Sequence, residues 1–503
     1  AWEAGDAHLF PPGGLAIKDH WFGHPRGLAT LFMTEMWERF TYYGMRGILI
    51  LFLVDAVATG GFGLDDRKAT AIYGLYTTAT YLMALPGGWL ADRLLGAQRA
   101  VVWGAALILV GNTMLAIPAG PTLFYTGCLV VVLGVGLLKP NISAMVAQLY
   151  PEGGAARDAG FTLFYLGINV GALIGSLATP WLAQQYGWRA GFAGAAVAMA
   201  LGLAQFLLTR HHLGDAGKRA RTTHPALLAA DQRQWRGVVA VLTAIAVVTV
   251  LIAAGIITLD PTQVARWTAV AILVVTVGYF GYLLTFAGLD RTERRRVLVV
   301  LALFVSSALF WAGYEQAGSS LNLFAERFTD RVVGGFEIPA GWFQAPSALY
   351  ILLFAPAFSA LWIYLGRRNL DPSAPAKFAF GLLLLGLGFL VMVGAATVVA
   401  SGRLAGPQWL LLAYLLHCFG ELCLSPVGLS SVTKLAPPRL VGQMMGLWFL
   451  ATSLGLLLAG LVAGGFDAQD VASMPGQYLK IALVSLGAGA ALLLIASRVQ
   501  RLA

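Results

Sequence analysis

The stretch 28–56 carries charged side chains inside an otherwise apolar run. It contains Glu35, Glu38, Arg39 and Arg46. Steps of four, three and four residues connect Glu35, Arg39, Tyr42 and Arg46 and place them on one face of a helix, and Glu38 lies beside them. In lipid such a charged face must meet partner charges or water. We therefore expect it to line a polar pathway in which carboxylates can exchange protons.

Three more charged residues lie deep inside apolar stretches: Lys139, Glu315 and Glu421. We expect Lys139 to pair with carboxylates, because it lies too deep in its span for its side chain to reach the membrane interface. The buried set holds four acids and three cations, so one carboxylate lacks a protein partner. It must carry a proton or meet a cation from a ligand. A zwitterion fits this field, with its carboxylate toward the cations and its amine toward the surplus acid.

The elements that position these residues are membrane helices. Only 11% of the 503 residues are charged and 58% are hydrophobic, with a mean hydropathy of +0.75, whereas soluble domains carry about a quarter charged residues. A membrane helix needs about 20 apolar residues. We expect an all-α integral membrane protein with fourteen spans: 28–56, 68–95, 99–117, 121–149, 158–184, 188–209, 237–259, 265–288, 296–325, 340–365, 377–399, 407–435, 440–464 and 477–499.

Loop charges predict the orientation of these spans. If both termini are cytoplasmic, most of the 33 lysines and arginines fall in cytoplasmic segments. The net charge of +9 therefore reflects topology, and no nucleic-acid partner is expected. Within the seventh and eighth spans, residues 237–259 and 267–287 contain no charged side chain. Without these two spans, two six-helix halves remain, with a site expected between them. The predicted parts are an N-terminal cytoplasmic segment, a six-helix bundle, a cytoplasmic linker, an inserted hairpin and a second six-helix bundle: 1–27, 28–209, 210–236, 237–290 and 291–503.

A loop motif follows the second span: Gly88-Trp-Leu-Ala-Asp92-Arg93-Leu-Leu-Gly96-Ala-Gln-Arg99. It resembles the loop signature of the major facilitator superfamily, which implies the 6+6 fold of that superfamily in two pseudo-symmetric halves. Glycine allows a close approach of helices, and an acid at a helix end can be clamped by arginine. Asp92 and Arg93 are therefore candidates for a loop that latches one conformational state.

Four further motifs resemble those of proton-dependent oligopeptide transporters of the bacterial di- and tripeptide type. They lie in both halves of the chain, and the inserted helix pair is similar to that of bacterial members. The motifs are Glu35-x-x-Glu38-Arg39-Phe40-x-Tyr42-Tyr43-Gly44, Gly-Leu-Leu-Lys139-Pro140-Asn141, Phe161-x-x-Phe164-Tyr165-x-x-Ile168-Asn169-x-Gly171-Ala172 and Phe310-Trp311-x-x-x-Glu315-Gln316.

This resemblance implies proton-coupled import of di- and tripeptides across the inner membrane by alternating access, by a chain expected to be monomeric, surrounded by lipid and without cofactor or metal. Proton coupling is implied for Glu35, Glu38, Arg39, Lys139 and Glu315. In substrate binding, Arg39 and Lys139 would meet the peptide carboxylate, Glu421 and Asn169 its amine, and Arg46 would pair with Glu315. The remaining implied binding residues are Tyr42, Tyr43, Tyr81, Trp311, Gln344, Ser347, Ser425 and Trp448.

One departure and several alternatives accompany this interpretation. Ser347 stands where many relatives carry asparagine, which puts in doubt how the peptide amine is held. The alternative function is proton-coupled transport of another small solute, such as nitrate or a drug; nitrate offers no amine for Glu421. A membrane-embedded enzyme would need a nucleophile–base pair or metal ligands, and only His417 among the histidines lies within a span. The three cysteines sit in apolar runs and indicate no disulfide framework.

Overall fold

The computed structural model describes residues 20–219, 225–437, 440–466 and 470–500. The described chain is almost entirely helical, as expected, with two short β-hairpins. The first half comprises β1 (His20–Trp21), β2 (His24–Pro25), α1 (Arg26–Val54), η3 (Val57–Thr59), α2 (Asp66–Leu82), α3 (Ala84–Leu90), η4 (Ala91–Leu95), α4 (Ala97–Ala116), α5 (Pro121–Gln148), α6 (Gly154–Tyr186), α7 (Trp188–Thr209) and η5 (Arg210–Leu213).

The inserted hairpin and the second half follow. The hairpin is α8 (Pro225–Ala253) and α9 (Pro261–Thr285). The second half comprises α10 (Arg291–Tyr314), η6 (Glu315–Gly318), α11 (Ser320–Phe328), β3 (Val332–Val333), β4 (Phe336–Glu337), η7 (Ala340–Gln344), α12 (Ala345–Arg367), α13 (Ala374–Ala400), α14 (Gln408–Leu435), α15 (Val441–Ala463), η9 (Val471–Ser473) and α16 (Met474–Gln500).

Every one of the fourteen predicted spans contains a helix. Among the described residues, twelve helical segments are long and apolar enough to cross a membrane by length and composition. The other two, α1 and α2, fall short for reasons visible in the sequence. Helix α1 carries the charged face described above, and α2 has only 17 residues before the chain continues as α3.

Two predicted spans are interrupted rather than continuous. The predicted span 68–95 consists of α2, α3 and η4. Pro86 lies four residues after Leu82, where α2 ends, and proline cannot donate the backbone hydrogen bond that would continue the helix. The predicted span 296–325 breaks at Glu315 into the tighter turn η6 before α11 begins.

The predicted linker 210–236 ends earlier than expected. Helix α8 begins at Pro225 and therefore includes residues assigned to the linker. The prediction measured only the apolar part of the helix, which starts near Asp231. A helix does not stop where the hydrocarbon layer begins, because its backbone hydrogen bonds are equally satisfied in water.

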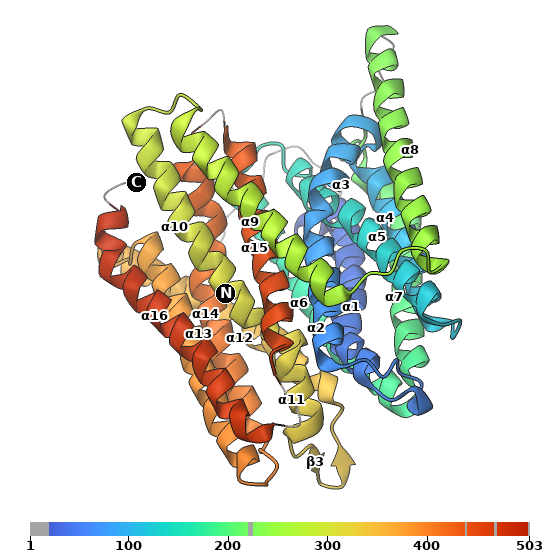
Figure 1. Ribbon diagram of the computed structural model, residues 1–503. Helices are drawn as coiled ribbons and strands as arrows, with labels where there is room; N and C mark the ends of the chain where they lie inside the picture. Colours follow the sequence, from blue (N-terminus) through green and yellow to red (C-terminus); the bar gives the residue numbers. More distant parts are fainter. Residues whose placement is uncertain (1–19, 220–224, 438–439, 467–469, 501–503) are drawn as a thin grey trace, which may run out of the picture.

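The helices form two bundles (Figure 1), one built from α1–α7 and the other from α10–α16. We call the surface where α1, α6 and α10 begin the basic face, and the surface that carries β3, β4 and the start of α2 the opposite face. In Figure 1 the bundles meet near β3 and α11 and separate toward the other end. The halves are thus joined at the opposite face and parted at the basic face.

Polar contacts between the halves lie toward the opposite face. Arg327 of α11 forms a two-point ion pair with Asp66 of α2, with Nη–Oδ distances of 2.6 and 2.8 Å. The Asn322 side-chain amide donates to the carbonyl of Gly47 at 3.1 Å. The Trp342 indole donates to the carbonyl of Leu177 at 2.7 Å. These bonds close the opposite face.

Candidate substrate and proton site between the halves

The charged face of α1 folds into a compact cluster. Arg39 Nε lies 3.1 Å from Glu35 Oε1, and the guanidinium also contacts Glu38. All three side chains are buried. Oε2 of Glu35 and Oε1 of Glu38 are buried without a hydrogen-bond partner in the described chain. One cation is therefore shared by two carboxylates, and each carboxylate keeps an oxygen free to accept a proton.

Lys139 differs from the expectation of a paired carboxylate. Its Nζ lies 3.6 Å from the centre of the Tyr81 ring, and among the described residues no acid lies within ion-pair distance of it. Arg39, in contrast, contacts one oxygen of Glu35 and one of Glu38. A ring face attracts the ammonium through its quadrupole without neutralising it. Lys139 therefore keeps its charge available for an anion.

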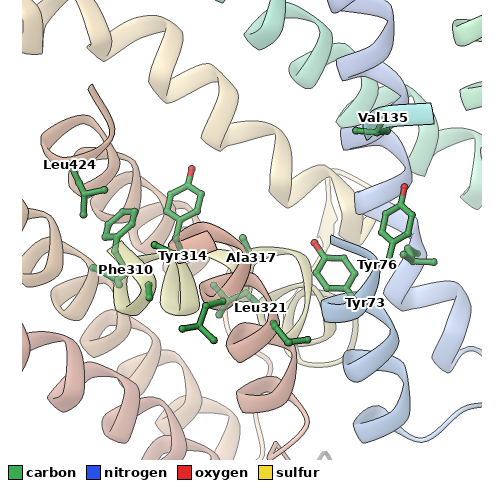
Figure 2. Close-up of a cluster of buried hydrophobic side chains, with 14 of the residues drawn as sticks. Tyr73, Tyr76, Val135, Phe310, Tyr314, Ala317, Leu321 and Leu424 are labelled. Atoms are coloured by element: carbon green, nitrogen blue, oxygen red, sulfur yellow. The ribbon is translucent and has the colours of Figure 1, made fainter. Parts of the chain in front are cut away.

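Arg46 and Glu315 form the expected pair across the two halves. Nη2 lies 3.1 Å from Oε2, and Nη1 lies 3.4 Å from Oε1. The Tyr73 hydroxyl of α2 lies beside them: a side-chain carbon added at Gly318 would come within 1.7 Å of it. Figure 2 shows Tyr73 next to Ala317 and Leu321 of the second half. The turn η6 thus needs glycine at this position to fit against α2.

Glu421 on α14 is a half-buried acid that has no basic partner in the described chain. Its Oε2 is buried and makes no hydrogen bond. The Tyr314 hydroxyl of α10 lies beside this carboxylate and 4.0 Å from the thiol of Cys418. The Tyr314 ring stacks on Phe310 with centroids 5.6 Å apart, as Figure 2 shows. Tyrosine and cysteine thus surround the acid with weakly polar groups that leave its charge exposed to a ligand.

The predicted amide and hydroxyl residues meet the helix backbone. Asn169 donates to the carbonyl of Tyr165 in its own helix at 3.0 Å. Gln344 donates to the carbonyl of Arg46 at 3.4 Å, and its Oε1 is buried without a partner. Ser347 accepts from the Cys418 thiol through its backbone carbonyl at 3.5 Å. The Ser347 backbone therefore joins α12 to α14 close to Glu421.

Among the predicted aromatic residues, those of the first half lie with the cations. The Arg39 guanidinium lies 5.2 Å from the centre of the Tyr42 ring, and that of Arg46 lies 5.7 Å from the Tyr43 ring. Tyr42 and Tyr43 meet edge to face at 5.3 Å. With Tyr81 against Lys139, each of the three cations thus has one tyrosine ring beside it.

The tryptophans of the second half have different surroundings. Trp448 is buried against Phe378, at a centroid distance of 6.0 Å, and against Gly428. Trp311 packs edge to face on Tyr314 at 5.4 Å, and its indole nitrogen is buried without a partner. Trp311 therefore has a donor to offer, whereas Trp448 serves packing within its own bundle in this conformation. Ser425, one turn beyond Glu421, is half-buried.

The predicted latch residues lie at the basic face. Asp92 and Arg93 are exposed on η4, a single π-helical turn. No ion pair involves either residue in the described parts of the chain. The backbone of η4 instead receives the linker, through Arg219 and the carbonyl of Leu94 at 3.3 Å.

Two contacts of the site could not be found from sequence patterns. The pair Asp66–Arg327 joins residues 261 positions apart, and each looks like an ordinary charge at a span end. The Tyr314 hydroxyl lies beside Glu421, although Tyr314 falls on an unspecified position of the motif that precedes Glu315. The i, i+3 spacing of Cys418 and Glu421 was the available signal for the thiol.

The ion pairs of the site leave two charged residues without a partner of opposite charge in the described chain. Arg39 forms ion pairs with Glu35 and Glu38, and Arg46 forms one with Glu315. Lys139 in the first half and Glu421 in the second half then remain as opposite, partly accessible charges without an ion-pair partner in the described chain. The seam between the bundles thus carries a lysine without an ion-pair partner on one side and a glutamate without one on the other, among the described residues.

The chain is similar along most of its length to known proteins. The chain is 43% identical to the peptide transporter YePEPT of Yersinia enterocolitica, over 98% of this chain and 97% of that protein. It is 36% identical to a di-/tripeptide transporter of Lactococcus lactis, over 86% and 88% of the two chains. The crystal structure of a peptide transporter POT in complex with sulfate superposes with a TM-score of 0.89, at 38% identity over 96% of both chains.

A second solved structure, a POT family transporter in complex with 5-aminolevulinic acid, superposes with a TM-score of 0.85, at 32% identity over 96% of this chain and 98% of that one. The sequence model of the POT family matches residues 98–480. A match over most of the chain, together with relatives aligned along nearly its whole length, shows that this protein belongs to the POT family.

Proposed function

We propose that this protein is a proton-coupled symporter that carries di- and tripeptides across the membrane by alternating access. The single observation that carries the proposal is that Lys139 and Glu421, on opposite halves, have no ion-pair partner among the described residues. A short peptide is a zwitterion whose carboxylate and amine match these charges in sign. Relatives named as peptide transporters and dipeptide and tripeptide permeases support the same substrate class.

Proton coupling follows from the buried carboxylates. Glu35 and Glu38 share one arginine, and Glu315 depends on Arg46 across the halves. A change in the separation of the halves alters the partner of Glu315, and an unpaired buried carboxylate favours its protonated form. Protonation of Glu315 releases Arg46 and allows the opposite face to part, which couples proton entry to conformational change.

We further propose that the protein lies in the inner membrane with both termini cytoplasmic, so that the basic face is the cytoplasmic face. The excess of arginine and lysine in the loops of that face supports this orientation. The conformation described here is then open toward the cytoplasm. A monomer suffices for transport, since one chain contains both halves of the site.

The test is proton flux in proteoliposomes loaded with a pH-sensitive dye. Addition of dialanine outside, with an inside-negative potential, is expected to acidify the lumen. Nitrate at the same concentration is expected to produce no signal, because it offers no cation to Glu421. If nitrate but not dialanine acidified the lumen, the substrate would be the anion and not the peptide. Peptide uptake without acidification would refute proton coupling.

A further inference from the structure

The inserted hairpin contacts both halves of the protein. Helix α8 stands beside the first bundle, and α9 runs diagonally across the molecule toward the second bundle (Figure 1). No residue of the apolar window of α8, within Asp231–Ala253, is buried. Helix α8 is therefore held by a few discrete contacts, whereas α9 buries Ala265, Ile272, Thr276, Phe280 and Leu283 along its length.

The first contact lies at the basic face of the first half. The Arg219 guanidinium binds both carboxylate oxygens of Asp231, at 2.9 and 2.7 Å, and also donates to the carbonyl of Leu94 in η4. One guanidinium nitrogen, Nη2, makes both bonds to the carboxylate, and the other, Nη1, makes the bond to Leu94, so the guanidinium bridges α8 and η4. The pair joins the beginning of α8 to the loop that carries the signature motif.

The linker before α8 lies directly on that loop. The Gln98 side chain donates to the carbonyl of Ala216 at 2.7 Å, and its backbone N–H donates to the carbonyl of Gly217 at 3.0 Å. Gly96 of the motif has φ +80°, and a side-chain carbon there would come within 2.8 Å of the Arg219 backbone nitrogen. The second glycine of the motif thus makes room for the linker in this protein.

The second contact lies at the opposite face, again on the first half. The turn between α8 and α9 and the start of α2 line a common cavity of about 520 Å³. Its walls are Leu64, Lys68, Ile72 and Tyr125 from the first half and residues 258–261 and Gln263 from the hairpin. Helix α9 therefore leaves the first half at the opposite face.

The third contact lies on the second half, near the basic face. The rings of Phe280 and Phe304 meet at 5.8 Å. The Tyr279 hydroxyl donates to the side chain of Gln443 at the start of α15. Phe280 and Leu283 of α9 are buried, unlike the residues of α8. Helix α9 thus crosses the seam between α2 and α15 and ends on the opposite bundle.

We propose that the hairpin α8–α9 is a strap that ties the signature loop of the first half to the start of α15, and that it favours the conformation in which the halves part at the basic face. The inference deepens the proposed function, because alternating access requires the two bundles to move relative to each other. All three contacts are made in the conformation described here, so their loss should destabilise it relative to the others. Arg219 and Asp231 act as positioning residues that touch no substrate.

The experiment measures the separation of the basic face directly. Spin labels are attached at Asp158→Cys on α6 and Lys434→Cys on α14, which are both exposed, and distances are recorded in liposomes without substrate. Asp231→Asn is expected to lower the ratio of the long to the short distance about two- to fivefold, the range of a partly exposed ion pair. The charge swap Arg219→Asp with Asp231→Arg is expected to restore most of the ratio.

Asp215→Asn is the matched control, because Asp215 forms a similar ion pair with Lys218 in the same linker, at 3.1 Å but fully exposed. It should leave the ratio unchanged. Tyr279→Phe weakens the third contact and should act in the same direction as Asp231→Asn, even if the latter folds poorly. The proposal would be refuted if Asp231→Asn and Asp215→Asn gave the same ratio of the long to the short distance, whether that ratio is unchanged or changed.

A transport measurement separates this inference from the proposed function. In Asp231→Asn, the rate of dialanine counterflow should fall in proportion to the ratio of the long to the short distance. The dialanine concentration that gives half-saturation should stay within about twofold of that of the unmodified protein. Absence of dialanine transport in the unmodified protein would refute the proposed function but leave the distance measurement valid. A changed half-saturation with unchanged distances would place Asp231 near the substrate and refute the strap.

Discussion

Arg46 of α1 and Glu315 at the start of η6 bind each other across the two halves, with Nη2–Oε2 and Nη1–Oε1 distances of 3.1 and 3.4 Å. The pair lies where the bundles converge, on the same side of the charged cluster as the Asp66–Arg327 pair. It therefore ties the protonation of one carboxylate to the closure of the opposite face.

Glu315→Gln is expected to abolish uphill uptake of dialanine and to retain counterflow. The amide keeps the shape of the side chain but cannot cycle a proton. Removing one partner of a buried pair typically costs about 3–5 kcal/mol, so the melting temperature in detergent should fall as well. Accumulation assays with and without a proton gradient provide the measurement. Asp66→Asn, which breaks the more exposed pair with Arg327, should keep uphill uptake.

Glu35→Gln and Glu38→Gln are expected to lose proton-driven accumulation separately. Each carboxylate has a buried oxygen without a partner, which is where a proton can bind. Counterflow, which needs no net proton movement, should persist in both variants. Uphill uptake at the unmodified rate in both variants would contradict their role in coupling.

Lys139→Ala is expected to weaken binding of free peptides more than that of C-terminally amidated peptides. The ammonium stacks on Tyr81 and is free to meet a carboxylate. Competition by dialanine and dialanine amide against a labelled peptide measures the difference. Lys68→Ala is the matched control, since Lys68 pairs with Asp65 and is half exposed. If Lys139→Ala weakened the binding of both ligands equally, the peptide carboxylate would not bind at Lys139.

Glu421→Gln is expected to narrow the preference for a free peptide amine. A hydrogen bond to a charged group contributes about 1.5–3 kcal/mol, or roughly 10- to 100-fold in affinity. Competition by dialanine and N-acetyl-dialanine measures the ratio in the variant and in the unmodified protein. Glu326→Gln is the control, because Glu326 pairs with Arg331. An unchanged ratio in Glu421→Gln would show that the amine is bound elsewhere.

The hairpin β1–β2 is expected to loosen at acidic pH. His24 Nδ1 and the Tyr150 hydroxyl are 2.7 Å apart. Burial lowers the pKa of His24, as does the neighbouring His20. The docked hairpin thus binds the proton less readily than the free segment does. Its stability is complete above the ordinary histidine pKa of about 6.5 and decreases as the pH falls below that value.

Spin-label mobility at Phe22→Cys, an exposed position in the turn of this hairpin, measures the loosening. Mobility should rise between about pH 7 and pH 5, around the ordinary histidine pKa. His24→Gln should remove most of that rise, whereas His211→Gln, an exposed histidine outside the hairpin, should not. A rise of equal size in His24→Gln would assign the titration to another group.

The sequence by itself determined the class, the helices and the list of charged residues that lie inside them. Long apolar stretches have no stable place in water, so composition alone required a membrane protein. The charged side chains of α1 were recognisable because burying a charge in lipid is costly. Their spacing also placed Glu35 and Arg39 together, because residues four apart on a helix are neighbours whatever the rest of the chain does.

Only the tertiary structure decided which charges neutralise one another. Counting the buried charges predicted one surplus acid. The count could not show that the Lys139 ammonium would lie against the Tyr81 ring instead of pairing with an acid. Nor could it reveal the pair Asp66–Arg327 or the path of α9 across the seam. These contacts join residues far apart in the chain, and their energies depend on how two bundles meet, which no local pattern records.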